Sequence, residues 1–194
     1  TWTLLQVKER SLASFKRQKS IILHGATRFA GVYYTMERLV ELESILKQIA
    51  ISNEFSERGY GTAGEEVEEI CSESQFWTGM KLLCQFLSPI KKLIRLMDLD
   101  CHTTEHLYPL MLEIEASWQD DPELPTSKKV PARFRNAALK LHASRNKWMT
   151  FNIHYACYAL SPQYHHVHIF SNNKVMAGFK LLVEYFCRHM HISN

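Results

Sequence analysis

The chain has 194 residues, of which 46% are apolar and 22% are charged. This length is enough to bury a hydrophobic core and suits one compact domain or a domain with a helical appendage, and the composition excludes a disordered or fibrous protein. The formal net charge of +3 is too small to indicate a nucleic-acid binder by itself, although it does not exclude a local basic face.

Cysteine usage and the absence of a long apolar run limit where the protein works. The five cysteines are widely spaced and no pair has CxxC spacing, which favours reduced thiols in a cytosolic or nuclear protein. No apolar stretch is long enough to span a membrane, and the first residues lack the pattern of a signal peptide. Because the chain lacks an initiator Met, we expect an excised segment or a processed product.

Helical periodicity begins at the N-terminus. Leu4, Leu5, Leu12 and Phe15 are expected to line one side of a first helix. The other side of that helix is expected to be basic, and it gathers Lys8, Arg10, Lys16, Arg17 and Lys19.

Beyond a break at His24-Gly25, the most regular helix is predicted over residues 29–51. Apolar residues recur there at three- and four-residue steps, and Thr27 suits the N-cap. A polar loop is predicted over residues 53–64, where three glycines indicate flexible backbone.

Further helices are predicted over residues 65–71, 75–97, 104–118, 132–160 and 172–190. Pro89 is expected to kink or split the second of these, because proline removes a backbone donor. Residues 119–131 hold three prolines and read as a loop. We expect the aromatic side chains Phe76, Trp77, Trp118 and Trp148 to anchor the packing of the helices. No alternating strand pattern of useful length is present, so the predicted fold class is all-α or nearly so.

Four segments, in this order, resemble a known family. They are TRFAGVYYTMERLVELESILKQI (27–49), FWTGMKLLCQFLSPIKKLIRLMD (76–98), HLYPLMLEIEASW (106–118) and KLHASRNKWMTFNIHYACYALSPQY (140–164). They are similar to motifs of hAT-superfamily transposases, including plant BED-finger transposase-like proteins. The ordered set covers nearly the whole chain.

The resemblance implies a position inside a larger enzyme. The family's catalytic core is RNase H-like and holds three metal-binding carboxylates, and a helical insertion domain interrupts it. By this resemblance residues 1–24 form a helix linking from the core, and residues 25–194 form the insertion domain. The carboxylates then lie outside this chain, so we expect no catalysis by the chain alone and Mg²⁺ only in the complete core.

The resemblance also suggests a site and partners. Arg28 and Phe29 match the family's "TRW" or "TRF" motif, whose aromatic residue is implicated in holding a flipped base. Here Phe stands where Trp is commoner. With Lys16, Arg17 and Lys19 they form the predicted DNA-binding set. The expected partners are DNA and further copies of the chain or another protein, and the expected location is the nucleus.

Two functions stay open. The chain is either a DNA-positioning segment of a transposase-like protein or a domesticated helical module that binds a protein partner. Metal binding is the less favoured interpretation of Asp98, Asp100 and Glu105, which suit helix ends. The same holds for the histidines and cysteine at residues 165–168 and 187–191, whose spacing matches no zinc finger.

Overall fold

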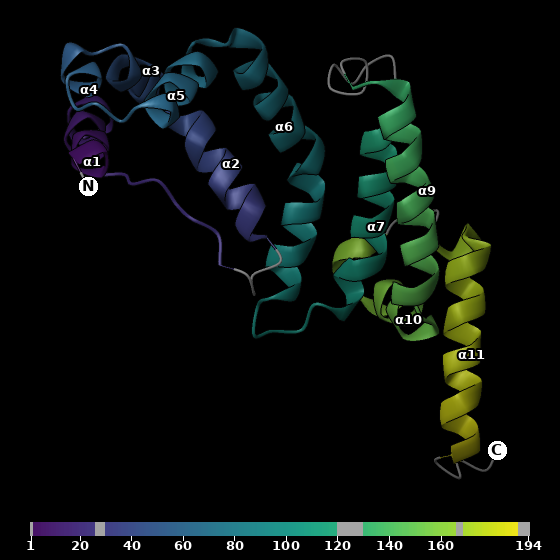
Figure 1. Cartoon of the computed structure of the whole chain (residues 1–194). Helices are drawn as coiled ribbons and strands as arrows, with labels where there is room; N and C mark the ends of the chain where they lie inside the picture. The colour runs from purple at the N-terminus through teal and green to yellow at the C-terminus, as the bar shows by residue number, and fades with distance from the viewer. Residues whose placement is uncertain (1, 26–29, 120–129, 166–168, 190–194) are drawn as a thin grey trace. The chain divides into compact units, whose positions relative to one another are not determined.

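The computed structural model describes residues 2–25, 30–119, 130–165 and 169–189. Over these ranges the chain consists of helices, turns and extended connections, with no strand (Figure 1). The prediction of an all-α chain is therefore confirmed for the described residues. The chain divides into two compact units, Thr1–Leu87 and Ser88–Asn194. The predicted boundary after residue 24, which refers to a core outside this chain, stays a prediction.

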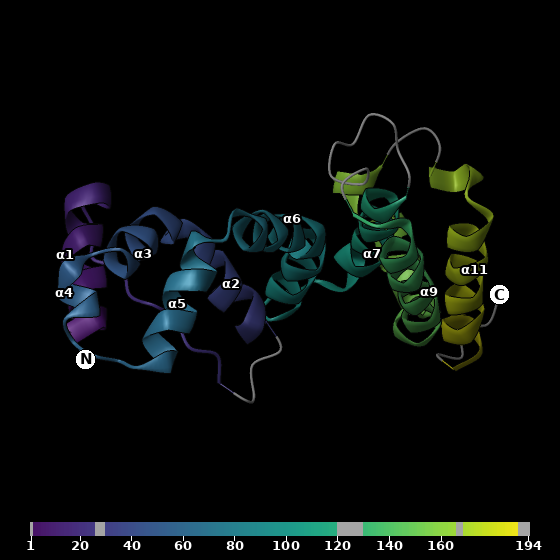
Figure 2. The same ribbon diagram turned by 45° about the horizontal axis from the view of Figure 1, so that its top comes forward.

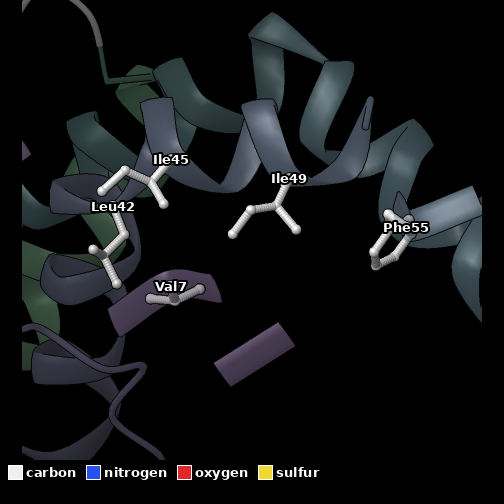
Figure 3. Close-up of a cluster of buried hydrophobic side chains, with 5 residues drawn as sticks. All are labelled: Val7, Leu42, Ile45, Ile49 and Phe55. Atoms are coloured by element: carbon white, nitrogen blue, oxygen red, sulfur yellow. The ribbon is translucent and has the colours of Figure 1, made fainter. Parts of the chain in front are cut away.

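The first unit is built from short helices around one apolar cluster. Its helices are α1 (Trp2–Phe15), α2 (Gly31–Glu41), α3 (Glu43–Ala50), α4 (Asn53–Ser56), α5 (Thr62–Ser72) and the first part of α6 (Ser74–Met97). Figure 3 shows the buried cluster, which joins Val7 of α1, Leu42, Ile45 and Ile49 of the α2–α3 region, and Phe55 of α4. The three- and four-residue spacing of the middle members places them on one helix face.

The buried side of α1 differs from the predicted one. Leu4, Leu5, Leu12 and Phe15 are all exposed, and Val7 and Ser11 are buried instead. The reason is that Val7 meets the apolar face of α3, which the sequence of α1 alone does not reveal. The expected apolar side of this helix therefore faces solvent.

Two predicted boundaries in this unit were also wrong. The helix expected over residues 29–51 is interrupted at Leu42, which lies between α2 and α3. The loop expected over residues 53–64 holds the short helix α4 and the start of α5. Gly59 and Gly61, which join these two helices, adopt positive φ angles of 63° and 60°, a conformation that glycine adopts without strain. Thr27, the expected cap, lies outside the described residues.

The second unit packs the remaining helices around a cluster of tyrosines. It contains α7 (Thr104–Trp118), α9 (Ala132–Met149), α10 (Asn152–Leu160), η1 (Pro162–Tyr164), η2 (Ile169–Ser171) and α11 (Asn173–His189). Helices α7 and α9 lie side by side in both views (Figures 1 and 2), and α10 packs on α7 and on α11. The helix predicted over residues 132–160 is divided in two, because α9 ends at Met149 and α10 begins at Asn152.

Aromatic rings form the core of this unit. Tyr108 of α7 lies edge-on to Tyr155 and Tyr158 of α10, with ring centroids 4.8 and 5.2 Å apart. Its hydroxyl accepts a hydrogen bond from the Asn172 amide at 3.1 Å. The buried phenol is thus satisfied, and Tyr108 joins α7 both to α10 and to the residue that precedes α11.

The predicted aromatic anchors divide into two groups. Trp77 and Trp118 are buried, as expected, and the Trp77 indole donates to the Cys71 carbonyl oxygen at 2.9 Å. Phe76 is half-buried. Trp148 is 78% exposed, so its assignment to the core was wrong. The reason is that α9 packs through another of its sides, which the sequence of the helix alone does not reveal.

Candidate nucleic-acid interface

The structure describes only part of the predicted DNA-binding set. Arg28 and Phe29 lie outside the described residues, so their predicted role stays a prediction. Lys16 and Arg17 are exposed. They do not belong to the first helix as expected, because α1 ends at Phe15 and Lys16 adopts a left-handed φ of 53°.

Lys19 is engaged within the fold and also lies beyond α1. Its backbone N–H donates to the buried Ser11 hydroxyl at 2.8 Å, which turns the chain back along α1. Its ammonium pairs with the Glu41 carboxylate and lies 4.0 Å from the centre of the Phe15 ring. A phosphate at this position would compete with Glu41, so Lys19 is a weaker candidate for nucleic-acid contact than Lys16 or Arg17.

Basic residues elsewhere in the chain are also partly engaged with other groups. The Lys92 ammonium donates to both carboxylate oxygens of Glu113, at 2.6 and 2.8 Å. Arg135 is buried, and both Lys91 and Arg135 interact with other groups of the chain. Only exposed cations with no carboxylate beside them can receive a phosphate without a competitor.

The charges are distributed very unevenly along the chain. Residues 1–123 hold 13 Lys and Arg against 19 Asp and Glu, whereas residues 124–183 hold nine Lys and Arg and no Asp or Glu. The net charge of +3 conceals this contrast. Such a segment supplies a positive field of its own, which acidic side chains of neighbouring elements, such as Glu115 of α7, offset in part.

Helix α9 concentrates that positive field on one face. Arg133, Lys140 and Lys147 are exposed and follow one another at seven-residue intervals. Seven residues are close to two turns, so the three cations form one row with steps of about 10 Å along the axis. Among the described residues, no group forms an ion pair with any of them. We call Arg133, Lys140 and Lys147 the basic row.

A row of large apolar side chains runs beside the basic row. Phe134, Leu141 and Trp148 each follow a member of the basic row by one residue, and all three are exposed. Leu141, in the middle of the helix, is 61% exposed. We call Phe134, Leu141 and Trp148 the apolar row.

The opposite side of α9 faces α7 and fixes the orientation of both rows. Arg135 and His142 are buried there, and the His142 ring lies edge-on to Trp118 with centroids 6.0 Å apart. Burial lowers the pKa of His142, although Glu115 and a backbone hydrogen bond at Met111 oppose the shift. His142 and Arg135 therefore lie on the side of α9 that faces α7, and the basic row lies on the outward side.

The predicted DNA-binding set contains none of the exposed cations of α9, which are Arg133, Lys140, Arg145 and Lys147. Sequence reasoning treated the helix as part of a family motif and assigned Trp148 to the core. Two signals were present in the sequence: the seven-residue repeat of basic-apolar pairs and the absence of carboxylates from residue 124 to residue 183. These two signals can be interpreted only when it is known which side of α9 packs on α7.

Metal ligands do not gather in the described part of the chain. No group of three or more His, Cys, Asp or Glu side chains lies close enough there to hold an ion. His166, His168 and His191, which the zinc alternative needed, lie outside the described residues. Among the helices that are described, none is both long and apolar enough to cross a bilayer.

Comparison with known proteins adds no relative. No protein-family model matches the chain, and neither a curated protein nor a solved structure matches it. The likeness to hAT transposases rests on the sequence motifs, and the candidate interface rests on the geometry of α9.

Proposed function

We propose that this chain binds nucleic acid through the basic row of α9 and serves as a non-catalytic, DNA-positioning segment of a hAT transposase-like protein. The observation that supports the first part most strongly is the outward row of Arg133, Lys140 and Lys147, which has no ion-pair partner among the described residues. Fixed cations at regular intervals release counterions when they meet phosphates, which is the main source of affinity for a polyanion.

The surroundings of the row strengthen the proposal. Arg145 is exposed on the same helix and has no ion pair within the described ranges. No carboxylate exists between residues 124 and 183 to repel a phosphate backbone. The width of the DNA major groove admits an α-helix, and a row of exposed cations can follow the phosphates of a single strand.

The link to transposition comes from the motif order. The four segments similar to hAT motifs span residues 27–164 and include α9. In this proposal the chain belongs to the helical insertion domain of an RNase H-like enzyme, supports the DNA and the oligomer, and acts in the nucleus. The Mg²⁺ and the carboxylates belong to the catalytic core of the complete enzyme.

Salt-dependent binding tests the interface. The double variant Lys140→Ala/Lys147→Ala should weaken binding to a fluorescent DNA duplex at low salt. The slope of log affinity against log salt should fall by about two, close to one for each phosphate that is no longer neutralised. Fluorescence anisotropy at several salt concentrations measures both quantities.

A matched variant separates this interface from the sequence prediction. Lys16→Ala/Arg17→Ala removes the same charge from exposed positions of the first unit. We expect a smaller loss of affinity, because carboxylates offset the cations of that unit. Equal affinity and equal slope for wild type and Lys140→Ala/Lys147→Ala would contradict the proposed interface.

A second function is favoured by the exposed side of α1. Leu5 and Leu12 lie there with no apolar cover in the described structure, together with Leu4 and Phe15. Such a face is typical of a helix that packs on another protein segment. A helical protein-interaction module is therefore the alternative, and loss of partner capture in Leu5→Asp/Leu12→Asp with unchanged DNA affinity would favour it.

A further inference from the structure

The C-terminal end of α9 exposes more aromatic surface than a phosphate contact requires. Trp148 is 78% exposed in the last turn of the helix, and Phe151, just beyond that end, is 59% exposed. The structure keeps these rings outside the core although burial would stabilise each of them. An exposed aromatic ring near cations is complementary to a ligand that has both a flat apolar face and negative charge.

The cations are placed next to the indole. Arg145 lies three residues before Trp148, which makes these two side chains neighbours on the helix surface, whereas Lys147 directly precedes Trp148 and lies about 100° away around the helix axis. Both cations are exposed and form no ion pair with any residue that the structure describes. The end of α9 thus offers an aromatic face with the Arg145 cation beside it and the Lys147 cation on the adjoining basic row.

The second ring is held in place by the start of α10. The Phe151 backbone N–H donates to the His154 Nδ1 atom at 2.9 Å, and the two rings are tilted by 32° with centroids 6.0 Å apart. Burial lowers the pKa of His154, which keeps the imidazole neutral and able to accept that hydrogen bond. Phe151 therefore has one side supported by the histidine and stays largely open to solvent.

From this arrangement we infer that Trp148, aided by Phe151, stacks on an unpaired base of a nucleic acid whose phosphates follow the basic row. The inference rests on the proposed function and adds the class of nucleic acid: single-stranded, or carrying exposed bases. Stacking on aromatic side chains is how proteins hold unpaired bases without reading their sequence, because every base has a π-face.

A membrane surface fits the same residues less well. The buried side of α9 is marked by Arg135 and His142, and the 3.6-residue repeat places Arg133 and Lys140, not the apolar row, directly opposite. A flat bilayer approaching the exposed side would meet cations first and would leave the apolar row at the flank. A strand of nucleic acid can lie along the basic row and turn a base sideways onto Trp148.

The test compares strands of equal charge with and without bases. Full-length protein is titrated with a single strand of about 20 thymidine nucleotides, long enough to exceed the usual site size, and with an abasic strand of the same length. Trp148→Ala should weaken binding to the thymidine strand about tenfold and leave the abasic strand unchanged, whereas Trp148→Phe should retain most of the affinity. Because Trp148 carries no charge, the salt dependence should not change.

Fluorescence provides an independent measurement on the same protein. Trp77 and Trp118 are buried, Trp2 is half-buried and Trp148 is exposed, so the thymidine strand should quench mainly Trp148. We expect that quenching to disappear in Trp148→Phe. Far-UV circular dichroism checks that each variant is folded, which an exposed position should allow.

The outcomes separate the two proposals. Equal effects of Trp148→Ala on both strands, or no effect on either, would overturn the stacking inference. If Lys140→Ala/Lys147→Ala still weakened binding in that case, the proposed phosphate contact of the basic row would be retained and only the stacking of a base would be rejected. If Trp148→Ala weakened binding to anionic phosphatidylserine vesicles and left the binding of both strands unchanged, the inference would be overturned in favour of a lipid surface.

Discussion

At the scale of single residues, the most informative side chain in the second unit is His142. It is 7% exposed, and its Nε2 atom has no hydrogen-bond partner within the described structure. Leaving a buried ring nitrogen unpaired is costly, and charging the ring would cost more. His142 therefore makes the packing of α9 on α7 sensitive to pH.

The sign of that sensitivity follows from the pKa. Burial holds the pKa of His142 below its ordinary value of 6.5, so the unfolded chain binds a proton at pH values where the folded chain does not. The free energy of unfolding should then fall as the pH drops below about 6.5. Urea unfolding on either side of that pH, at about 7.5 and about 5.5, followed by circular dichroism, measures the fall.

The variant His142→Phe isolates this contribution. It keeps a ring of similar size against Trp118 and removes the titrating group. The difference in unfolding free energy between the two pH values should shrink, although His154, whose pKa burial also lowers, retains part of it. An unchanged difference would show that His142 is not responsible.

At the scale of elements, the contact between α10 and α11 depends on one glycine. A Cβ atom at Gly178 would lie 2.7 Å from the Tyr155 Cβ atom and 2.9 Å from its Cδ2 atom. Gly178→Ala should destabilise the second unit by about 1–3 kcal/mol through overpacking, even though alanine favours a helix by about 1 kcal/mol over glycine.

A second glycine provides the control. Gly79 lies within α6, and a Cβ atom there would meet nothing within 4 Å. Gly79→Ala should be neutral or stabilising, because only the helix propensity changes. Equal midpoints of urea unfolding for the two variants would contradict the close contact at Tyr155.

The elements also show how far sequence reasoning reaches. The all-α class and the span of α11 followed from local periodicity, whereas the division of residues 132–160 into α9 and α10 was not located. The packed side of α1 could not be predicted in this way. Val7 is buried by side chains of α3, and Ser11 is buried where it accepts a hydrogen bond from the Lys19 backbone N–H. Periodicity identifies an apolar face, but only tertiary contacts decide whether that face is covered.

The candidate site shows the same limit. The Lys16 and Arg17 pair was predicted from basic clustering, and the structure does leave both side chains exposed. The basic row of α9 escaped prediction because its members stand seven residues apart rather than clustered. Their common face emerges only when the helix and its packed side are known.

At the scale of the whole molecule, charge is the organising feature. An acidic stretch over residues 1–123 is followed by residues 124–183, which hold nine cations and no carboxylate. Helix α9 lies within the second stretch and exposes all of its cations except Arg135. A polyanion should therefore find α9 by long-range attraction before any short-range contact forms, and the rate of association should fall with salt.

Lysine footprinting on the intact chain tests this account most directly. Acetylation rates of individual lysines are measured by mass spectrometry with and without single-stranded DNA at low salt. The basic row predicts that DNA slows the modification of Lys140 and Lys147 several-fold and leaves the exposed Lys8 of the first unit unchanged. Uniform protection, or protection of Lys8 and Lys16 with Lys140 and Lys147 unaffected, would contradict a nucleic-acid interface on α9.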